Sequence, residues 1–318
     1  MEMFAQRWHN LFMNSRKKGF WGQVVLIVAL LVRRVLVRIA DPMISYRVGR
    51  FTIQLPLSHE LPVYRELYEY YALNIARITQ GVICKYPHLS FIDIGANVGD
   101  TIFLVRNSVS CPVLGIEGNP RFFSIMKKNC KQLDGIVLRE FFVGEKDEEA
   151  ACQLHQAKGS ASLLNKKGER PVQLMRLETI LEKEQGFSGA KILKIDTDGF
   201  EFKIIRGAQG WITRIKPVIF FEYDPVCLRQ KNEDAVSIFS ALSAMGYQSM
   251  LVYHNTGEYM LSVNLKDDRL IKDLYEYFSG RRSVVYGDMC AFHQEDSDLF
   301  GQIRDSEISY FRQQRTGS

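Results

Sequence analysis

Near-continuous apolar segments alternate with amphipathic segments through the middle of this chain. Strands that are apolar on both sides are typical of a parallel sheet with helices on both faces. The pattern therefore predicts an α/β fold with a mostly parallel sheet. The predicted strands cover residues 90–95, 112–117, 136–143, 191–196 and 218–222, and the predicted helices cover 99–108, 120–132, 200–208 and 232–245.

The pattern changes on both sides of this core. A strand is predicted at 50–55 and a helix at 65–78, and residues 144–190 interrupt the alternation with a small-residue segment at 159–163 that is either a turn or a cover over the site. After residue 246, alternating runs on either side of Asn255-Thr-Gly257 predict a β-hairpin. A helix at about 266–278 and a last strand near 288–293 follow. The sheet is therefore expected to end in antiparallel strands.

Positive charge is concentrated at the start of the chain. The first 50 residues contain nine Lys or Arg and two acids, whereas all 318 residues together carry a net charge of +5. The body is therefore slightly acidic, which disfavours a nucleic-acid-binding domain because such a domain carries its basic patch on the folded body. We predict two parts, a basic amphipathic arm at 1–50 and the main domain at 51–318.

The arm contains the apolar run Val24–Val32. This run is shorter than the about 20 residues that a membrane span needs, it is followed directly by Arg33 and Arg34, and no cleavage site follows. It predicts an amphipathic helix over residues 20–40 with a basic edge. Such a helix can lie on an anionic membrane surface, or it can pack on its own domain or on a second subunit. Both interpretations stay open here, as does the oligomeric state.

Cysteine and histidine usage gives no sign of a metal or disulfide framework. The six cysteines include no C-x-x-C pair, and the six histidines show no paired spacing. Thiols scattered through a chain of this length are typical of reduced cysteines in the cytoplasm. We therefore expect a cytoplasmic protein, with possible peripheral contact to the inner face of the membrane.

The segment Phe91-Ile-Asp-Ile-Gly-Ala-Asn-Val-Gly99 is the clearest chemical motif. A buried strand runs into two glycines and then a helix start, which is the context in which backbone approaches a nucleotide. Asn97 stands where a dinucleotide fingerprint has its second glycine, which a pyrophosphate needs for close approach. This favours S-adenosylmethionine over NAD and predicts cofactor contacts from Asp93, Gly95, Asn97 and Gly99.

Glu117 ends the next predicted strand. It follows the glycine loop at about the 20-residue distance at which an acid accepts hydrogen bonds from ribose hydroxyls. The two oxygens of one carboxylate can accept from two neighbouring hydroxyls. Glu117 is therefore predicted to bind the ribose of the cofactor.

These motifs together resemble the FkbM methyltransferase family. The glycine loop, Gly115-Ile-Glu-Gly-Asn-Pro120, Leu177-Glu-Thr-Ile-Leu181 and Ile192-Leu-Lys-Ile-Asp-Thr-Asp-Gly-Phe-Glu-Phe202 followed by Arg206-Gly-Ala208 carry the resemblance. It covers roughly residues 85–225, with Asp198 where the family usually has Glu. The resemblance implies a class I, Rossmann-like methyltransferase fold and an S-adenosylmethionine-dependent O-methyltransferase that acts on sugars or other hydroxylated natural products, as in polysaccharide biosynthesis.

Three polar residues at strand ends are predicted to act in catalysis. Ligands of parallel sheets bind beyond the carboxyl ends of the strands, where Asp196 and Glu222 fall. Asp196 is predicted to accept the proton of the substrate hydroxyl. Lys194 lies two residues earlier on the same strand face and is predicted to influence that carboxylate or orient the substrate. Glu222 is predicted to contact the substrate.

Other residues near the site have ordinary structural interpretations. Asp198 and Glu201 are more simply explained as helix-capping acids than as metal ligands, so no metal is predicted. Tyr253, Tyr259 and Tyr286 either line a sugar-binding face or fill core and surface positions.

We therefore expect an O-methyltransferase whose acceptor is a small molecule, glycan or glycolipid precursor. The alternatives are an NAD-dependent oxidoreductase and a non-catalytic Rossmann-like binding module in a biosynthetic assembly.

Overall fold

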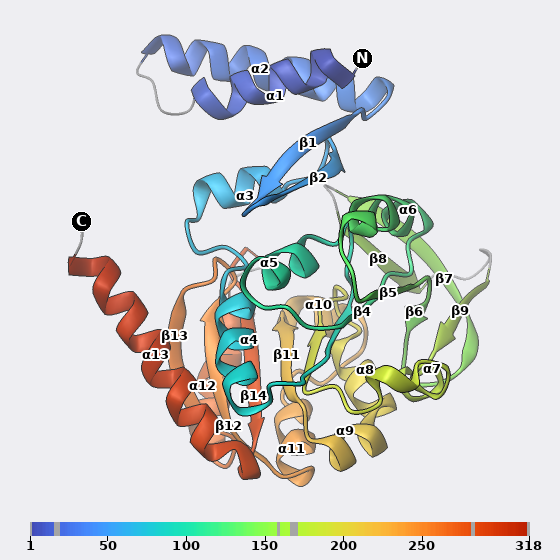
Figure 1. The fold of residues 1–318 in the computed structure, drawn as a ribbon, viewed down its shortest axis with the longest axis vertical. Helices are drawn as coiled ribbons and strands as arrows, with labels where there is room; N and C mark the ends of the chain where they lie inside the picture. The colour runs from blue at the N-terminus through green and yellow to red at the C-terminus, as the bar shows by residue number, and fades with distance from the viewer. Residues whose placement is uncertain (1, 16–19, 158–159, 166–170, 281–283, 317–318) are drawn as a thin grey trace.

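A computed structural model describes residues 2–15, 20–157, 160–165, 171–280 and 284–316. Within these residues, eight strands form one sheet in the order β13-β12-β14-β11-β10-β3-β4-β5 (Figure 1). Its strands are β3 (Phe91–Ile94), β4 (Val113–Ile116), β5 (Ile136–Arg139), β10 (Ile192–Ile195), β11 (Val218–Tyr223), β12 (Tyr247–His254), β13 (Tyr259–Asn264) and β14 (Gly287–His293).

The two ends of this sheet differ in strand direction. β5, β4, β3, β10 and β11 run parallel, whereas β14 pairs antiparallel with β11 and β12, and β12 pairs antiparallel with β13. β3, β4 and β10 are buried at every residue, which explains why their sequences are apolar without alternation. The predicted parallel core and the C-terminal hairpin are both confirmed.

Helices cover both faces of the sheet. They are α4 (Asn74–Lys85), α5 (Asp100–Ser108), α6 (Pro120–Asn129), α7 (Leu177–Lys183), α8 (Glu201–Gly207), α9 (Gln209–Ile215), α10 (Pro225–Gln230), α11 (Ser237–Ala244), α12 (Asp268–Ser279) and α13 (Ser297–Thr316). A further helix, α3 (Leu61–Leu67), lies between the arm and the sheet (Figure 1). Short 3₁₀ turns lie at Cys130–Gln132, Gln185–Phe187 and Gln294–Asp296.

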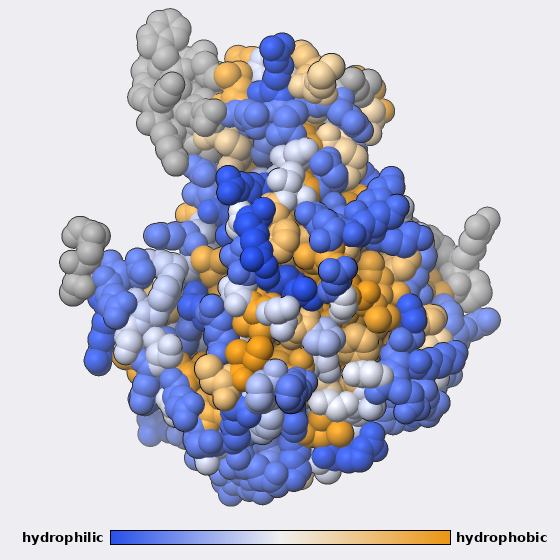
Figure 2. Space-filling model, in the orientation of Figure 1, coloured by the Kyte–Doolittle hydropathy of each residue, from blue (hydrophilic) through white to orange (hydrophobic). Residues whose placement is uncertain are grey.

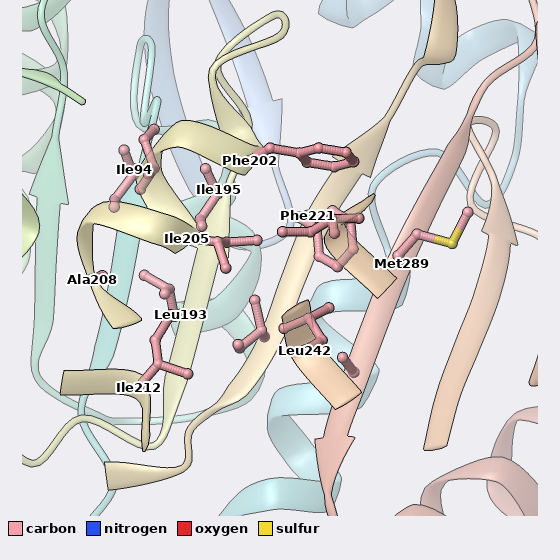
Figure 3. Close-up of a cluster of buried hydrophobic side chains, with 14 of the residues drawn as sticks. Ile94, Leu193, Ile195, Phe202, Ile205, Ala208, Ile212, Phe221, Leu242 and Met289 are labelled. Carbon is pink, nitrogen blue, oxygen red and sulfur yellow. The ribbon is translucent and has the colours of Figure 1, made fainter. Parts of the chain in front are cut away.

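Alternate strand residues divide the core into two clusters. On one face, Leu193, Ile195 and Phe221 pack against α8, α9 and α11, as Figure 3 shows for part of this cluster. On the other face, Ile192 and Val218 pack with residues of α4, α5 and α13. The same alternation places Asp93 and Lys194 together on the second face, because these residues pair directly in the register of β3 and β10.

The arm forms a helical hairpin above the main domain. α1 (Glu2–Ser15) and α2 (Phe20–Ile39) lie side by side at the top of Figure 1, so the helix predicted at 20–40 is confirmed. Next come β1 (Met43–Val48) and β2 (Phe51–Pro56), which pair across the expected boundary at residue 50. Ala5 of α1 and Ile44 of β1 are buried in the second core cluster, so the arm packs on the body. No helix in the described part of the chain has the length and apolar character needed to cross a membrane.

Several expected elements differ from those observed. The helix predicted at 65–78 is wrong, because α3 ends at Leu67 and a turn with Ala72 at φ 57° separates it from α4. Residues 142–175 add a second, four-stranded sheet within the described residues, and Gly159 lies outside them. The strands of this sheet are β6 (Phe142–Val143), β7 (Glu148–Ala157), β8 (Ser160–Asn165) and β9 (Pro171–Met175).

Candidate active site

A cavity of about 400 Å³ lies at the carboxyl ends of the parallel strands. Six of the predicted site residues line it, namely Gly95, Asn97, Glu117, Lys194, Asp196 and Glu222. The cavity wall also includes residues from α3, α5, α6 and β6 and from the loops beside these elements. The sheet topology thus brings together residues that are far apart in the sequence.

Backbone geometry explains the residue types of the glycine loop. Gly95 has φ +77°, and a Cβ there would lie 1.8 Å from the backbone oxygen of Asp196, so no other residue fits without displacing that loop. Asn97 has φ 50°, a left-handed conformation that asparagine tolerates better than most residues. Asn97 can therefore replace the second glycine of a dinucleotide motif without loss of the turn.

Glu117 is held at the edge of the cavity by backbone groups. Its two carboxylate oxygens accept hydrogen bonds from the N–H groups of Asn97 (2.8 Å) and Asn119 (2.7 Å). Each oxygen accepts one of these bonds and keeps a second acceptor site for a ligand hydroxyl. Burial raises the pKa of Glu117 to about 7, although these two N–H groups favour the charged form. The arrangement fits a carboxylate that binds a diol.

Apolar side chains lie next to Glu117. Phe122, Phe141 and Phe142 line the cavity, and Phe142 packs so closely on Gly118 that a Cβ there would lie 2.2 Å from its ring. This wall offers flat aromatic surface beside the carboxylate, which suits a nucleoside base next to its ribose. These phenylalanines come from α6 and the second sheet, so the glycine-loop motif contains no signal for them.

Lys194 joins two carboxylates. Its ammonium lies 3.0 Å from Oδ1 of Asp93 and 3.4 Å from Oδ2 of Asp196. Asp93 is fully buried, whereas the side chain of Asp196 is 49% exposed in the cavity. Burial opposes the charge of Lys194, but Asp93 and Asp196 more than offset this effect, so the pKa of its ammonium is raised. Lys194 is therefore charged and fixed, and Asp196 is the partner that faces a ligand.

Glu222 lies on the same side of the cavity as Asp196. Burial raises the pKa of Glu222 well above its usual range, and Asp196 and Asp198 add to this shift, so the protonated form is favoured. Burial, followed by neighbouring carboxyl groups, also raises the pKa of Tyr71 and Tyr286. Protonated Glu222 and the two phenols can therefore donate hydrogen bonds to a hydroxylated ligand.

Glu201 organises the turn after β10. Its carboxylate accepts from the backbone N–H and the hydroxyl of Thr197 (2.7 and 2.9 Å) and from the N–H of Gly199 (3.0 Å). Glu201 therefore shapes the loop that carries Asp196 and Asp198. Burial raises the pKa of Asp198 to about 6. No group of three or more His, Cys, Asp or Glu among the described residues could hold a metal ion.

Some expected residues lie away from the cavity and some lining residues were not expected. Asp93 and Gly99 are not among the lining residues, because Asp93 lies behind Lys194 and Gly99 faces Met126 and Cys130. Tyr253 is fully buried in the core, so only Tyr286 of the three suggested tyrosines lines the cavity. The lining residues that the sequence did not indicate include His59, Tyr64, Tyr71 and Asp100.

The lining fits S-adenosylmethionine better than NAD. Six carboxyl residues line the cavity, namely Glu60, Asp100, Glu117, Asp196, Asp198 and Glu222. Glu222 is protonated and adds no charge, but the ionised carboxylates of this wall favour a cationic sulfonium and oppose the two negative charges of a pyrophosphate. Asp100 lies in the first turn of α5, at the helix end that would otherwise attract that pyrophosphate. Glu117 and the phenylalanine wall have the chemistry that suits a ribose and its base.

This fold and site define a class I methyltransferase with S-adenosylmethionine as its cofactor. The methyltransferase FkbM domain family matches the chain over residues 93–249, the segment that contains Gly95, Glu117, Lys194, Asp196 and Glu222. Residues 93–249 of this chain therefore match the FkbM methyltransferase family. The expected family match and the expected cofactor, S-adenosylmethionine, are confirmed.

Several solved structures are similar to parts of the chain. The methyltransferase FkbM from Methylobacillus flagellatus KT is 15% identical over 51% of this chain and 39% of its own length, with a TM-score of 0.35. The METTL16 MTase domain is 14% identical over 84% and 79%, with a TM-score of 0.45. TYW2 of M. jannaschii in complex with AdoMet is 12% identical over 79% and 86%, with a TM-score of 0.38. No curated protein sequence matches the chain.

Proposed function

We propose that this protein transfers a methyl group from S-adenosylmethionine to a hydroxyl oxygen of a sugar, a glycan or glycolipid precursor, or a related natural product. The observation that carries the proposal is the half-exposed carboxylate of Asp196 inside the cavity, fixed by Lys194 at 3.4 Å. The bound cofactor supplies an electrophilic methyl group. Asp196 accepts the hydroxyl proton as the oxygen–carbon bond forms and the sulfur–carbon bond breaks.

The rest of the cavity supports an uncharged, hydroxyl-rich acceptor. Lys194 is the lining residue with an ammonium group, and it is already paired with Asp93 and Asp196. A phosphate group or a nucleic acid backbone would therefore meet carboxylates without a free cation to balance it. Glu222, Tyr71 and Tyr286 offer the donors and acceptors that sugar hydroxyls require.

Labelled methyl transfer tests this proposal. Purified protein is incubated with S-adenosylmethionine carrying a labelled methyl group and with cell extract, and the labelled product is isolated. Label in an alkali-stable methyl ether of a carbohydrate or other hydroxyl compound supports O-methylation. Label on nitrogen or carbon overturns the choice of nucleophile, and the absence of transfer favours the non-catalytic binding module.

We also propose that the arm binds an anionic membrane surface without crossing it. Val28, Leu31, Val35 and Ile39 are exposed apolar residues of α2 at helical spacing, and Leu30 is exposed as well. Arg34 and Arg38 are exposed beside them, so apolar and basic groups share one side of the helix. Figure 2 shows hydrophobic residues at the surface of the arm, interspersed with hydrophilic ones. Charge complementarity makes an anionic lipid surface the proposed partner.

A further inference from the structure

Arg33 of α2 holds the segment that leads into the active site. Its guanidinium donates hydrogen bonds to the backbone oxygens of Leu57 (3.1 Å), Ser58 (3.3 Å) and His59 (3.4 Å). Three carbonyls bound by one guanidinium fix the path of the backbone over these residues. Arg33 is therefore turned toward the domain, unlike its exposed neighbour Arg34.

A second residue of the arm holds the same segment. Asp41 accepts hydrogen bonds from the backbone N–H and the hydroxyl of Ser58, both at 2.8 Å. Asp41 also forms an ion pair with Arg121 of α6. The segment at residues 57–59 is thus held both by Arg33 within α2 and by Asp41, which follows the C-terminal end of α2.

The hydrogen bonds of His59 define its tautomer. Nδ1 accepts from the backbone N–H of Leu61 (3.2 Å), so Nε2 carries the proton and donates to Oδ1 of Asn97 (3.3 Å). Burial lowers the pKa of His59, which agrees with a neutral ring. His59 is 8% exposed and lines the cavity.

Asn97, within the glycine loop, connects His59 to Glu117. Its backbone N–H donates to Oε2 of Glu117 (2.8 Å), the carboxylate that faces the ribose position. Asn97 is also in a left-handed conformation with φ 50°, which depends on support from its surroundings. A continuous set of contacts therefore runs from Arg33 through His59 and Asn97 to Glu117.

We propose that Arg33 and His59 are positioning residues for the cofactor, so that the arm forms part of the S-adenosylmethionine site. This inference depends on the cofactor and is independent of the acceptor. His59 holds the side chain of Asn97, and Arg33 holds the backbone from which His59 reaches it. Without either residue, the loop between Gly95 and Gly99 has more conformations, and fewer of them bind the cofactor.

The test measures binding of S-adenosylhomocysteine by calorimetry on the full chain. In His59→Asn, the shorter amide keeps an acceptor near the position of Nδ1, but no group donates a hydrogen bond to Asn97. In His59→Gln, the longer amide places an N–H donor near the position of Nε2. His59→Asn and Arg33→Ala are each expected to weaken binding by about five- to tenfold, the effect of one hydrogen bond. His59→Gln is expected to restore most of the affinity. Arg34→Ala is the matched control on the same helix and is expected to leave binding unchanged.

The double variant Arg33→Ala/His59→Asn separates positioning from general destabilisation. If both residues act through Asn97, the double variant binds about as weakly as either single variant. Equal affinity of His59→Asn and His59→Gln overturns the proposal. Losses of affinity that add up in the double variant also overturn it. The same holds if Arg33→Ala binds S-adenosylhomocysteine as tightly as Arg34→Ala does. Because the two His59 variants do not alter the arm, they decide the role of His59 even where Arg33→Ala fails to fold. In that case Arg33→Lys, which keeps the charge but cannot bridge three carbonyls, decides the role of Arg33: affinity equal to that of the unaltered protein overturns it.

Discussion

The α-carbon of Gly95 lies against the backbone carbonyl of Asp196, so that an added Cβ would be 1.8 Å from that oxygen. The residue that begins the cofactor loop and the proposed base are therefore in backbone contact across β3 and β10. A change in one loop must displace the other. The proposed cofactor loop and the proposed base are thus positioned by the same backbone contact.

Gly95→Ala is expected to disturb both loops. The added methyl group meets backbone, and φ +77° is unfavourable for alanine, so we expect a loss of about 2–4 kcal/mol in the free energy of unfolding and weaker cofactor binding. Gly186→Ala is the control, because nothing lies within 4 Å of its added Cβ. Denaturant unfolding and calorimetry measure the two effects. An unchanged unfolding free energy for Gly95→Ala would contradict this account of the loop.

Cofactor affinity is expected to fall as the pH decreases below about 7. Burial raises the pKa of Glu117 to about 7. We propose that the ionised form of Glu117 is the one that accepts hydrogen bonds from two ribose hydroxyls. Above this pH the carboxylate is charged and binding is strongest, and each unit below it costs up to about tenfold in affinity. Binding of S-adenosylhomocysteine measured from pH 5.5 to 8.5 checks this.

Glu117→Gln provides the control for that pH profile. The amide keeps the shape of the side chain but cannot ionise, so we expect weak binding with little pH dependence over the same range. If the variant retains the profile of the unaltered protein, another group is responsible for the titration.

The sequence predicted the part of the site that depends on local patterns. Gly95, Asn97 and Glu117 lie at strand ends, where residue type follows from a turn or a nearby ligand, and buried β3, β4 and β10 were found from their apolar runs. His59, Tyr71 and Phe142 reach the cavity through pairing and packing between distant segments. No period or motif marks such residues. Likewise, β7 and β9 depend on partners that only the fold brings together.

Asp196→Asn is expected to separate chemistry from binding. The amide cannot accept the hydroxyl proton, so turnover should fall by about 10²–10⁴-fold. Cofactor affinity should remain close to that of the unaltered protein, because Glu117 and the loop at Gly95 are untouched. Single-turnover methyl transfer and calorimetry give the two values. Unchanged turnover would remove Asp196 from the mechanism.

Lys194 is expected to matter for stability as well as for the site. Lys194→Met leaves the fully buried Asp93 without its partner at 3.0 Å, which typically costs about 3–5 kcal/mol. Asp93→Asn/Lys194→Met removes both charges and should recover most of this stability. Methyl transfer should stay low in the double variant, since Asp196 has lost the cation 3.4 Å away. Recovery of full activity in the double variant would show that Lys194 serves the fold alone.

The arm should bind vesicles through residues that the domain leaves exposed. Arg33 contacts the segment at residues 57–59, so removal of the whole arm would alter the proposed cofactor site as well as the proposed membrane surface. Point variants are therefore the sharper test. Arg34→Glu/Arg38→Glu reverses two exposed charges, each worth about 1 kcal/mol near an anionic surface and weakened by salt.

Co-sedimentation with anionic and neutral vesicles measures this binding. The unaltered protein should sediment with anionic vesicles in a salt-sensitive way, and Arg34→Glu/Arg38→Glu should not. Arg269→Glu/Lys272→Glu makes the same change in charge at exposed positions of α12 and should leave binding nearly intact, since α12 lacks the row of exposed aliphatic residues that α2 carries beside its arginines. If both double variants lose binding equally, net charge alone is responsible. If the unaltered protein does not sediment with anionic vesicles, the exposed face of α2 is not a membrane surface.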